Sequence, residues 1–246
     1  MERVEMLLGG WMGGWAFDQV RNEEVSRIVT TNSAIIEAAK QRQVPVETTD
    51  VNSAPPSRPV VGISVHYPKI LSAVTLSRYL AVYNLHPSLL PWGRGAYAAF
   101  WSIWANEPAG ASLHKMTDRI DAGPLVDQIL TPVLSSDTCG TLHARIKGCE
   151  QVLFEKYWPR LTSGERLDCH PQSGGGSYHS IADYDRCVAA AETIERVPDL
   201  LRILRAVTFD SDSRLSIGVG GRVFDLRLDV GAGDNASSSA INESAD

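Results

Sequence analysis

Two segments of the sequence hold an amide, an imidazole and a carboxylate that could work together in acid–base chemistry. The first reads NLHPSLLP (84–91), and the second reads DRIDAGP (118–124). Because alternate residues of a strand share one face, Asn84 and His86 address the same small volume. Asp121 can complete the set from a neighbouring turn.

An amide and an imidazole on one face suit a reaction that passes through a tetrahedral oxyanion. The Asn84 amide or a protonated His86 ring can donate a hydrogen bond to that oxyanion. His86 can also move protons, since imidazole titrates near neutral pH, and the charge of Asp121 favours the protonated ring. Without further context, an Asn-x-His pair on a strand is more often part of a hydrogen-bonded turn than a catalytic pair. The surrounding elements decide between these two interpretations.

The chain before Asn84 predicts an α/β domain with a mostly parallel sheet. Short apolar runs alternate with helical patterns, which is the βαβα order of such sheets. The expected strands cover 4–8, 26–30, 44–48, 60–65 and 80–85, and the expected helices lie near Ala16 and over 33–41 and 70–79. Asn84 and His86 then stand at the carboxyl end of a strand, where open α/β sheets bind their ligands.

The rest of the chain predicts the remaining strands and a smaller C-terminal unit. Helices are expected over 96–105, 141–161 and 189–206, strands over 112–116 and 125–133, a Gly/Ser loop at 173–177, and two strands within 215–228 around Gly220-Gly221. We therefore expect a catalytic domain at 1–165 and a small α+β subdomain, a helix with a β-hairpin, at 166–230. A disordered tail is expected at 231–246, which offers almost nothing to bury.

Composition and charge favour a globular protein that acts on small molecules. The 246 residues are 43% hydrophobic and 21% charged, with no apolar run long enough to cross a bilayer. A net charge of -6 argues against a nucleic-acid partner but leaves room for a small anionic ligand. The start lacks a signal-peptide pattern and the four cysteines show no CxxC spacing, so we expect a cytoplasmic protein with free thiols. Since His143, His170 and His179 lack metal-ligand spacing, no metal is expected.

The two polar segments resemble the signature of the formyltransferase family that uses 10-formyltetrahydrofolate. The resemblance rests on Asn-x-His-Pro-Ser-Leu-Leu-Pro followed by Asp-Ala-Gly-Pro, and it extends over residues 4–162, including the strand order. It implies a Rossmann-like formyltransferase domain, 10-formyltetrahydrofolate as co-substrate, and Asn84, His86 and Asp121 as catalytic residues. An amine that attacks the formyl group must lose a proton while the folate nitrogen gains one, which suits His86.

The same resemblance implies where folate binds. Segment 67–72 is similar to the family segment that borders the folate pocket, and the pterin would lie between it and the loop at 116–121, held largely by backbone hydrogen bonds. His66 adjoins this segment and is expected to line the pocket, whereas His114 is expected to pack on its strand. Arg94, between two glycines, suits a mobile loop that closes on folate or a plain surface turn. The residues expected at the folate site are Pro68, Lys69, Leu71, Arg94, Met116 and Asp118.

The C-terminal part indicates the acceptor. The segments GGGSYH (174–179) and LRILRAVTF (201–209) resemble the C-terminal part of N-formyltransferases that act on nucleotide-linked dideoxy amino sugars. The resemblance implies such an acceptor, with dTDP-4-amino-4,6-dideoxyglucose as the first choice, and a product for surface glycans such as O-antigen. Phosphoribosylglycinamide and methionyl-tRNA formyltransferases are alternatives. The first normally has an Asn-rich loop after the first strand, and the loop at 9–14 is not Asn-rich. The second usually carries a basic C-terminal barrel that binds tRNA, whereas the C-terminal remainder here is short and not basic. A non-catalytic folate or nucleotide-sugar binding protein is a further alternative, which the complete set of polar residues disfavours.

Four residues are candidates for contact with the acceptor: Tyr67, Lys69, Tyr178 and Gly10. Gly10 lies in a Gly/Trp loop that could admit a phosphate at a helix N-terminus, although the loop lacks GxGxxG spacing and equally suits a tight turn. Lys69 also suits a solvated charge, and the tyrosines also suit core packing. Because sugar N-formyltransferases are commonly dimers and the C-terminal hairpin has an edge to pair, a homodimer is expected.

Overall fold

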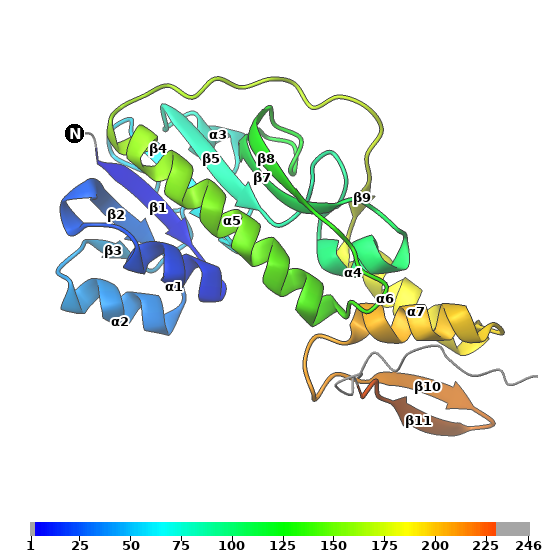
Figure 1. Ribbon diagram of the computed structural model, residues 1–246. Coiled ribbons are helices and arrows are strands. Elements are labelled where there is room, and N and C mark those ends of the chain that lie inside the picture. The colour runs from blue at the N-terminus through cyan, green and yellow to red at the C-terminus, as the bar shows by residue number, and fades with distance from the viewer. Residues whose placement is uncertain (1–2, 230–246) are drawn as a thin grey trace, which may run out of the picture.

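A seven-stranded sheet forms the centre of the protein (Figure 1), and the computed structural model describes residues 3–229, so the tail predicted at 231–246 lies outside them. The strands are β1 (Val4–Leu8), β2 (Val25–Val29), β3 (Val46–Glu47), β4 (Val61–Val65), β5 (Ala81–His86), β7 (Ala109–Lys115) and β8 (Leu125–Thr131). Their order is β3-β2-β1-β4-β5-β7-β8. Pairing is parallel from β3 to β5 and antiparallel at β7 and β8. The predicted Rossmann-like α/β fold with a mostly parallel sheet is confirmed.

Three helices cover one face of this sheet (Figure 1): α1 (Gly10–Asp18), α2 (Ser33–Gln41) and α5 (Cys139–Thr162). On β1, Met6 and Leu8 are buried in one core with Phe154 of α5, whereas Leu7 faces a second core with Leu71. A strand that is buried on both faces in this way is apolar on most positions, and the exception in β1 is Glu5, whose buried carboxylate pairs with Arg27. No helix within residues 3–229 has the length and apolar character needed to cross a membrane.

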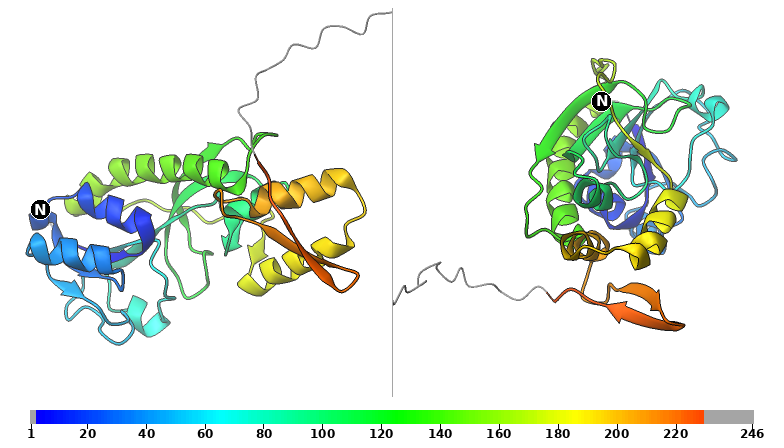
Figure 2. Two further views of the ribbon diagram at one scale, coloured as in Figure 1. Left: turned by 90° about the horizontal axis from the view of Figure 1, so that it is seen from below. Right: turned by 90° about the vertical axis from the view of Figure 1, so that its right-hand side faces the viewer.

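The C-terminal part of the chain, residues 178–226, packs at the end of the molecule that is far from α2 and β3 (Figure 2). Its elements are β9 (Tyr178–His179), α6 (Ile181–Ala189), α7 (Val197–Val207) and the hairpin of β10 (Leu215–Val219) and β11 (Arg222–Leu226). Ile203 of α7 and Leu215 of β10 are buried in the same core as Phe100 of α4 (Ala98–Trp104) and Ile146 of α5. The C-terminal elements are therefore fixed to the larger part of the molecule through shared apolar burial.

Two predicted helices differ from the structure. The single helix predicted over 189–206 is wrong, because α6 and α7 are separate helices with a short 3-10 turn between them. Pro198 lies in the first turn of α7, where its missing N–H is not needed, so it begins a helix instead of continuing one. The helix predicted over 70–79 is only α3 (Ala73–Leu76), which Ser72 caps at its N-terminus.

His143 of α5 makes the stability of the fold depend on pH. Its ring packs against Phe209, with 5.3 Å between the ring centroids. Burial, and secondly the charge of Lys147, lower the pKa of His143 from 6.5 to about 4. Between these values the unfolded chain binds a proton that the folded chain does not, so the free energy of unfolding falls as the pH drops from 6.5 to 4.

We expect His143→Gln to remove this part of the pH dependence, which amounts to roughly 2 kcal/mol. Urea denaturation of the wild type and the variant at pH 4.5 and pH 7.5 measures it. The wild type should lose more stability than the variant on acidification, and equal losses would contradict the assignment.

Candidate active site

A cavity of about 330 Å³ opens at the carboxyl ends of β4 and β5. Asn84 and His86 reach it from the end of β5, and Asp121 reaches it from the turn between β7 and β8. Residues 66–71, which follow β4, line the cavity as well. The structure therefore brings the three residues predicted to be catalytic next to the segment predicted to border folate, around a space large enough for part of a small molecule.

The Asn84 amide is fixed by His114 on the neighbouring strand. The antiparallel register of β5 and β7 puts the two residues directly opposite each other, with 3.2 Å between Asn84 Nδ2 and His114 Nε2. His114 Nδ1 lies 3.3 Å from the Lys115 carbonyl, which can only accept, so Nδ1 carries the hydrogen and Nε2 accepts from Asn84. This pairing uses one amide hydrogen of Asn84, and the other is free to donate to an oxyanion in the cavity.

The His86 ring is held in one tautomer. Its Nε2 lies 3.1 Å from the Gly93 carbonyl and donates to it, which leaves the lone pair on Nδ1. Burial lowers the pKa of His86, and the charge of Asp121 opposes that shift without cancelling it. At neutral pH the ring is therefore uncharged, and Nδ1 can accept a proton from a reacting group.

The Asp121 carboxylate lies between two imidazole rings. Its Oδ1 is 3.7 Å from His86 Nδ1 and 3.7 Å from His114 Nε2, and its Oδ2 accepts from the Gly95 amide at 2.9 Å. Burial alone would raise the pKa of Asp121, but the positive charge that the two rings carry when protonated, together with the Gly95 amide, outweighs burial and lowers the pKa to about 2. The carboxylate is thus charged at neutral pH, and it stabilises His86 whenever that ring gains a proton.

A brace of hydrogen bonds, formed by residues 93–95 with Glu107, Ser177 and His179, holds both of these groups. The imidazole donates to Gly93 and the carboxylate accepts from Gly95, so one short segment fixes both side chains. The Gly93 amide donates to Ser177 Oγ at 2.8 Å, and Ser177 Oγ donates to Glu107 Oε2 at 2.8 Å. The other oxygen of Glu107 lies 2.8 Å from His179 Nε2. This buried carboxylate therefore anchors the C-terminal strand β9 against the site.

Most of the residues predicted to contact folate line this cavity, and so do two of the four residues predicted for the acceptor, Tyr67 and Lys69. Tyr67 contributes to the wall, and its hydroxyl accepts from the Val51 amide at 3.1 Å, which ties the wall to the chain before β4. The predicted folate residues found in the lining are Pro68, Lys69, Leu71, Met116 and Asp118, and Lys69 was predicted for the acceptor as well.

Three predicted contact residues, Arg94, Tyr178 and Gly10, do not line the cavity. Arg94 belongs to the short strand β6 (Arg94–Gly95), which pairs with β9, and its guanidinium donates to Gln172 Oε1 at 2.6 and 3.1 Å. This paired strand differs from both structures suggested for Arg94, a mobile loop that closes on folate and a plain surface turn, because its backbone pairs with β9. Tyr178 is exposed on β9, and Gly10 begins α1 with a φ of 56°.

Two further histidines belong to the site. His114 was expected to pack on its strand, but it lines the cavity together with Met116, which follows β7. His66, which was expected to line the cavity, does so, and its Nε2 lies 2.8 Å from Glu150 Oε1 on α5. In the part of the chain covered by the structure, no three His, Cys, Asp or Glu side chains are grouped to hold a metal ion.

The fold and the site together define an α/β enzyme in which an amide, an imidazole and a carboxylate meet at the ligand-binding edge of the sheet. A model of the formyl transferase family matches residues 21–156, more than half of the chain, and the chain belongs to this family. The protein is therefore a formyltransferase.

Three solved structures show how far the similarity extends. A 4-N formyltransferase from Francisella tularensis is 20% identical with a TM-score of 0.80, over 94% of this chain and 98% of that one. An N-formyltransferase from Helicobacter canadensis, in complex with folinic acid and dTDP-3-aminofucose, is 17% identical with a TM-score of 0.72, over 90% of this chain and 85% of that one. A glycinamide ribonucleotide transformylase from Symbiobacterium toebii is 22% identical with a TM-score of 0.58, over 70% of this chain and 95% of that one.

The turn that carries Asp121 depends on a glycine, which makes Gly123→Ala informative. Asp121 has a φ of 48°, and a Cβ on Gly123 would lie 1.7 Å from the Lys115 carbonyl oxygen. The alanine must push the turn away from β7, so we expect kcat for formyl transfer to fall by at least about tenfold. Gly148→Ala is the matched control, since a Cβ there meets no atom within 4 Å. Unchanged kcat in the Gly123 variant would show that the turn relaxes without moving the carboxylate.

Proposed function

We propose that the protein transfers a formyl group from 10-formyltetrahydrofolate to the amine of a nucleotide-linked dideoxy amino sugar. The observation that carries this proposal is the share of the chain over which the structural similarity extends. The similarity to the N-formyltransferase in complex with dTDP-3-aminofucose covers 90% of this chain, whereas the similarity to a glycinamide ribonucleotide transformylase covers 70% of it. We take dTDP-4-amino-4,6-dideoxyglucose as the first acceptor to test and surface glycan assembly as the use of the product.

The geometry supports Asn84, His86 and Asp121 as the residues that carry the reaction. When the acceptor nitrogen attacks the formyl carbon, the free hydrogen of the Asn84 amide donates to the developing oxyanion. His86 Nδ1 takes a proton from the attacking nitrogen, and Asp121 stabilises the resulting imidazolium. As the bond between the formyl carbon and the folate nitrogen breaks, His86 returns the proton to that nitrogen, so protons and charge balance over the cycle.

The folate lies, in this proposal, between the wall at 66–71 and the loop at 116–121. Both segments line the cavity that holds the three polar side chains. Folate bound there would place its formyl group toward the carboxyl end of β5, and the acceptor would enter from the opposite side of the same opening. The apolar side chains of Leu71 and Met116 suit the flat face of a pterin.

A homodimer paired through the C-terminal hairpin belongs to the same proposal. Within residues 3–229, strands β10 and β11 pair with each other and with no other strand, so each has a free edge there, and Val219, Val223 and Phe224 are 56%, 74% and 49% exposed. A second copy would cover these apolar side chains and pair the free edge. Sedimentation velocity of the full chain tests it, since a monomer at micromolar concentration would contradict the dimer.

The experiment that tests the acceptor is release of tetrahydrofolate from 10-formyltetrahydrofolate in the presence of single acceptors. The set contains dTDP-4-amino, dTDP-3-amino and GDP-4-amino dideoxy sugars, glycinamide ribonucleotide and methionyl-tRNA. We expect turnover of one amino sugar, and its loss in the Asn84→Ala variant shows that the site described above is responsible. Turnover of the ribonucleotide or the tRNA alone would overturn the sugar acceptor, and folate binding without any turnover would favour a non-catalytic binding protein.

A further inference from the structure

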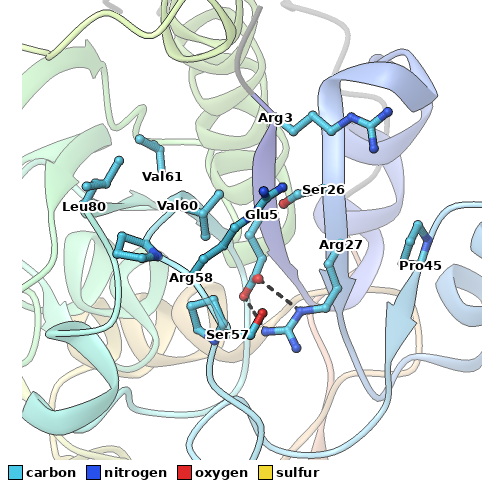
Figure 3. Close-up of a pocket in the computed structure, with 12 residues that line it drawn as sticks. Arg3, Glu5, Ser26, Arg27, Pro45, Ser57, Arg58, Val60, Val61 and Leu80 are labelled. Atoms are coloured by element: carbon cyan, nitrogen blue, oxygen red, sulfur yellow. Dashed lines mark hydrogen bonds and ion pairs between the residues drawn. The ribbon is translucent and has the colours of Figure 1, made fainter.

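A second cavity, of about 660 Å³, opens at the opposite edge of the sheet, where β1, β2 and β4 begin (Figure 3). It shares no lining residue with the catalytic cavity. The second cavity lies at the amino ends of the parallel strands, and the catalytic cavity lies at their carboxyl ends. The formyl transfer described above uses no residue of this second cavity.

The second cavity carries excess positive charge. Arg3, Arg27 and Arg58 line it, and Glu5 is its one acidic residue. Glu5 is 2% exposed, and a bidentate ion pair with Arg27 neutralises its charge. Arg27 Nε lies 3.0 Å from Glu5 Oε2, and Arg27 Nη2 lies 2.9 Å from Glu5 Oε1. The Tyr79 hydroxyl donates to the same carboxylate. Within residues 3–229 neither Arg3 nor Arg58 forms an ion pair with another side chain, so two positive charges remain for a ligand.

This excess stands out because the whole chain has a net charge of -6. A hollow with low-dielectric walls and two unbalanced guanidinium groups concentrates anions locally. Guanidinium groups present planar sets of donors that match the oxygens of phosphate, and they remain charged at every physiological pH. The charged side of the cavity therefore fits a phosphate group better than a neutral ligand.

Apart from Ser26 and Ser57, the uncharged residues of the wall are apolar, and the cavity is too large for phosphate alone. A volume of about 660 Å³ lies in the range of sites that hold molecules the size of a nucleotide. Leu80 on this wall is 62% exposed, which leaves apolar surface for a ligand to cover. The apolar residues of the wall are Pro45, Pro56, Pro59, Val60, Val61 and Leu80.

We propose that this cavity binds an organic phosphate. Its phosphate lies against Arg3 and Arg58 over the Glu5–Arg27 pair, and its apolar or planar body lies against the proline, valine and leucine wall. The buried ion pair serves as the rigid floor, because Arg27 also donates to the Ala54 carbonyl at 3.0 Å. The site is a binding site separate from the one that transfers the formyl group.

Adenosine 5′-monophosphate is a suitable probe, with adenosine and inorganic phosphate as its two halves, and isothermal titration measures their binding to the full chain. We expect the nucleotide to bind more tightly than either half. The variant Arg3→Gln/Arg58→Gln should weaken binding of the nucleotide by about tenfold or more, since charge-assisted hydrogen bonds to phosphate are lost. Arg27 is left intact, because its removal would strand the buried Glu5 carboxylate.

The matched control is Arg166→Gln/Arg196→Gln, which removes the same two charges from exposed positions that do not line the cavity. It should bind the nucleotide like the wild type, and formyl transfer should be unchanged in both double variants. The proposal is overturned if the nucleotide does not bind, if the Arg3/Arg58 variant binds it as tightly as the control, or if inorganic phosphate binds as tightly as the nucleotide.

Discussion

Replacing His86 with glutamine is expected to lower kcat for formyl transfer by about 10²- to 10⁴-fold, which is the contribution typical of a positioned acid–base group. Glutamine can still donate to the Gly93 carbonyl, so the surrounding loop keeps its contact, but it cannot take up a proton. Steady-state release of tetrahydrofolate measures kcat, and circular dichroism verifies the fold. His143→Gln is the matched control, because His143 does not line the catalytic cavity. A loss of less than tenfold at His86 would exclude it as the proton carrier.

The pH dependence of the same reaction separates the roles of His86 and Asp121. Burial lowers the pKa of His86 below its ordinary value, so activity should fall only when the pH drops clearly below 6.5. Asp121 favours the charged ring, and its removal lowers the pKa of His86 further. In the Asp121→Asn variant the acid limb of the kcat profile should therefore move to lower pH while the plateau falls. An acid limb that stays in place would contradict the electrostatic coupling.

Replacing Glu107 with alanine is expected to lower kcat by about 10- to 100-fold, although this residue does not line the catalytic cavity. Glu107 accepts hydrogen bonds from Ser177 and His179, and Ser177 accepts from the Gly93 amide. Without the carboxylate, the segment that fixes the His86 ring and the Asp121 carboxylate loses its anchor. Glu107 is thus a positioning residue, and its loss should affect kcat more than KM for folate.

Two further variants and a stability measurement test whether Glu107 acts by positioning the site. Glu107→Gln retains one acceptor oxygen and should recover part of the lost kcat. Glu165→Ala removes a carboxylate from an exposed ion pair with Arg160 and should leave kcat unchanged. Thermal denaturation of all three variants reports stability separately, so a fall in Tm with normal kcat at low temperature would show that Glu107 supports only the fold.

The local part of the site could be predicted from the sequence because its signals are local. Alternation along one strand placed Asn84 and His86 on a common face, and the continuous apolar runs marked strands buried on both sides. The Asp-Ala-Gly-Pro turn marked the end of β7 and the return into β8. The sheet type and the neighbourhood of Asp121 followed from these patterns.

The remaining part depended on contacts between distant segments, which single-strand patterns do not contain. The position of His114 opposite Asn84 comes from the register between two antiparallel strands. The fixed position of Arg94 comes from pairing with β9 and from Gln172, both far along the chain. Glu107 lies in a connection without regular structure, so nothing in its surroundings indicated that it holds the site together.

The brace from β9 has a consequence for how the enzyme becomes active during its synthesis on the ribosome. The residues proposed to be catalytic lie between positions 84 and 121, but the side chains that fix their supporting segment include Gln172, Ser177 and His179. A nascent chain that has exposed the whole family-matched region, 21–156, still lacks these supports. Chains that terminate before β9 therefore carry the proposed catalytic residues without the hydrogen bonds that fix their supporting segment, and we expect such chains to transfer formyl groups more slowly than the full chain.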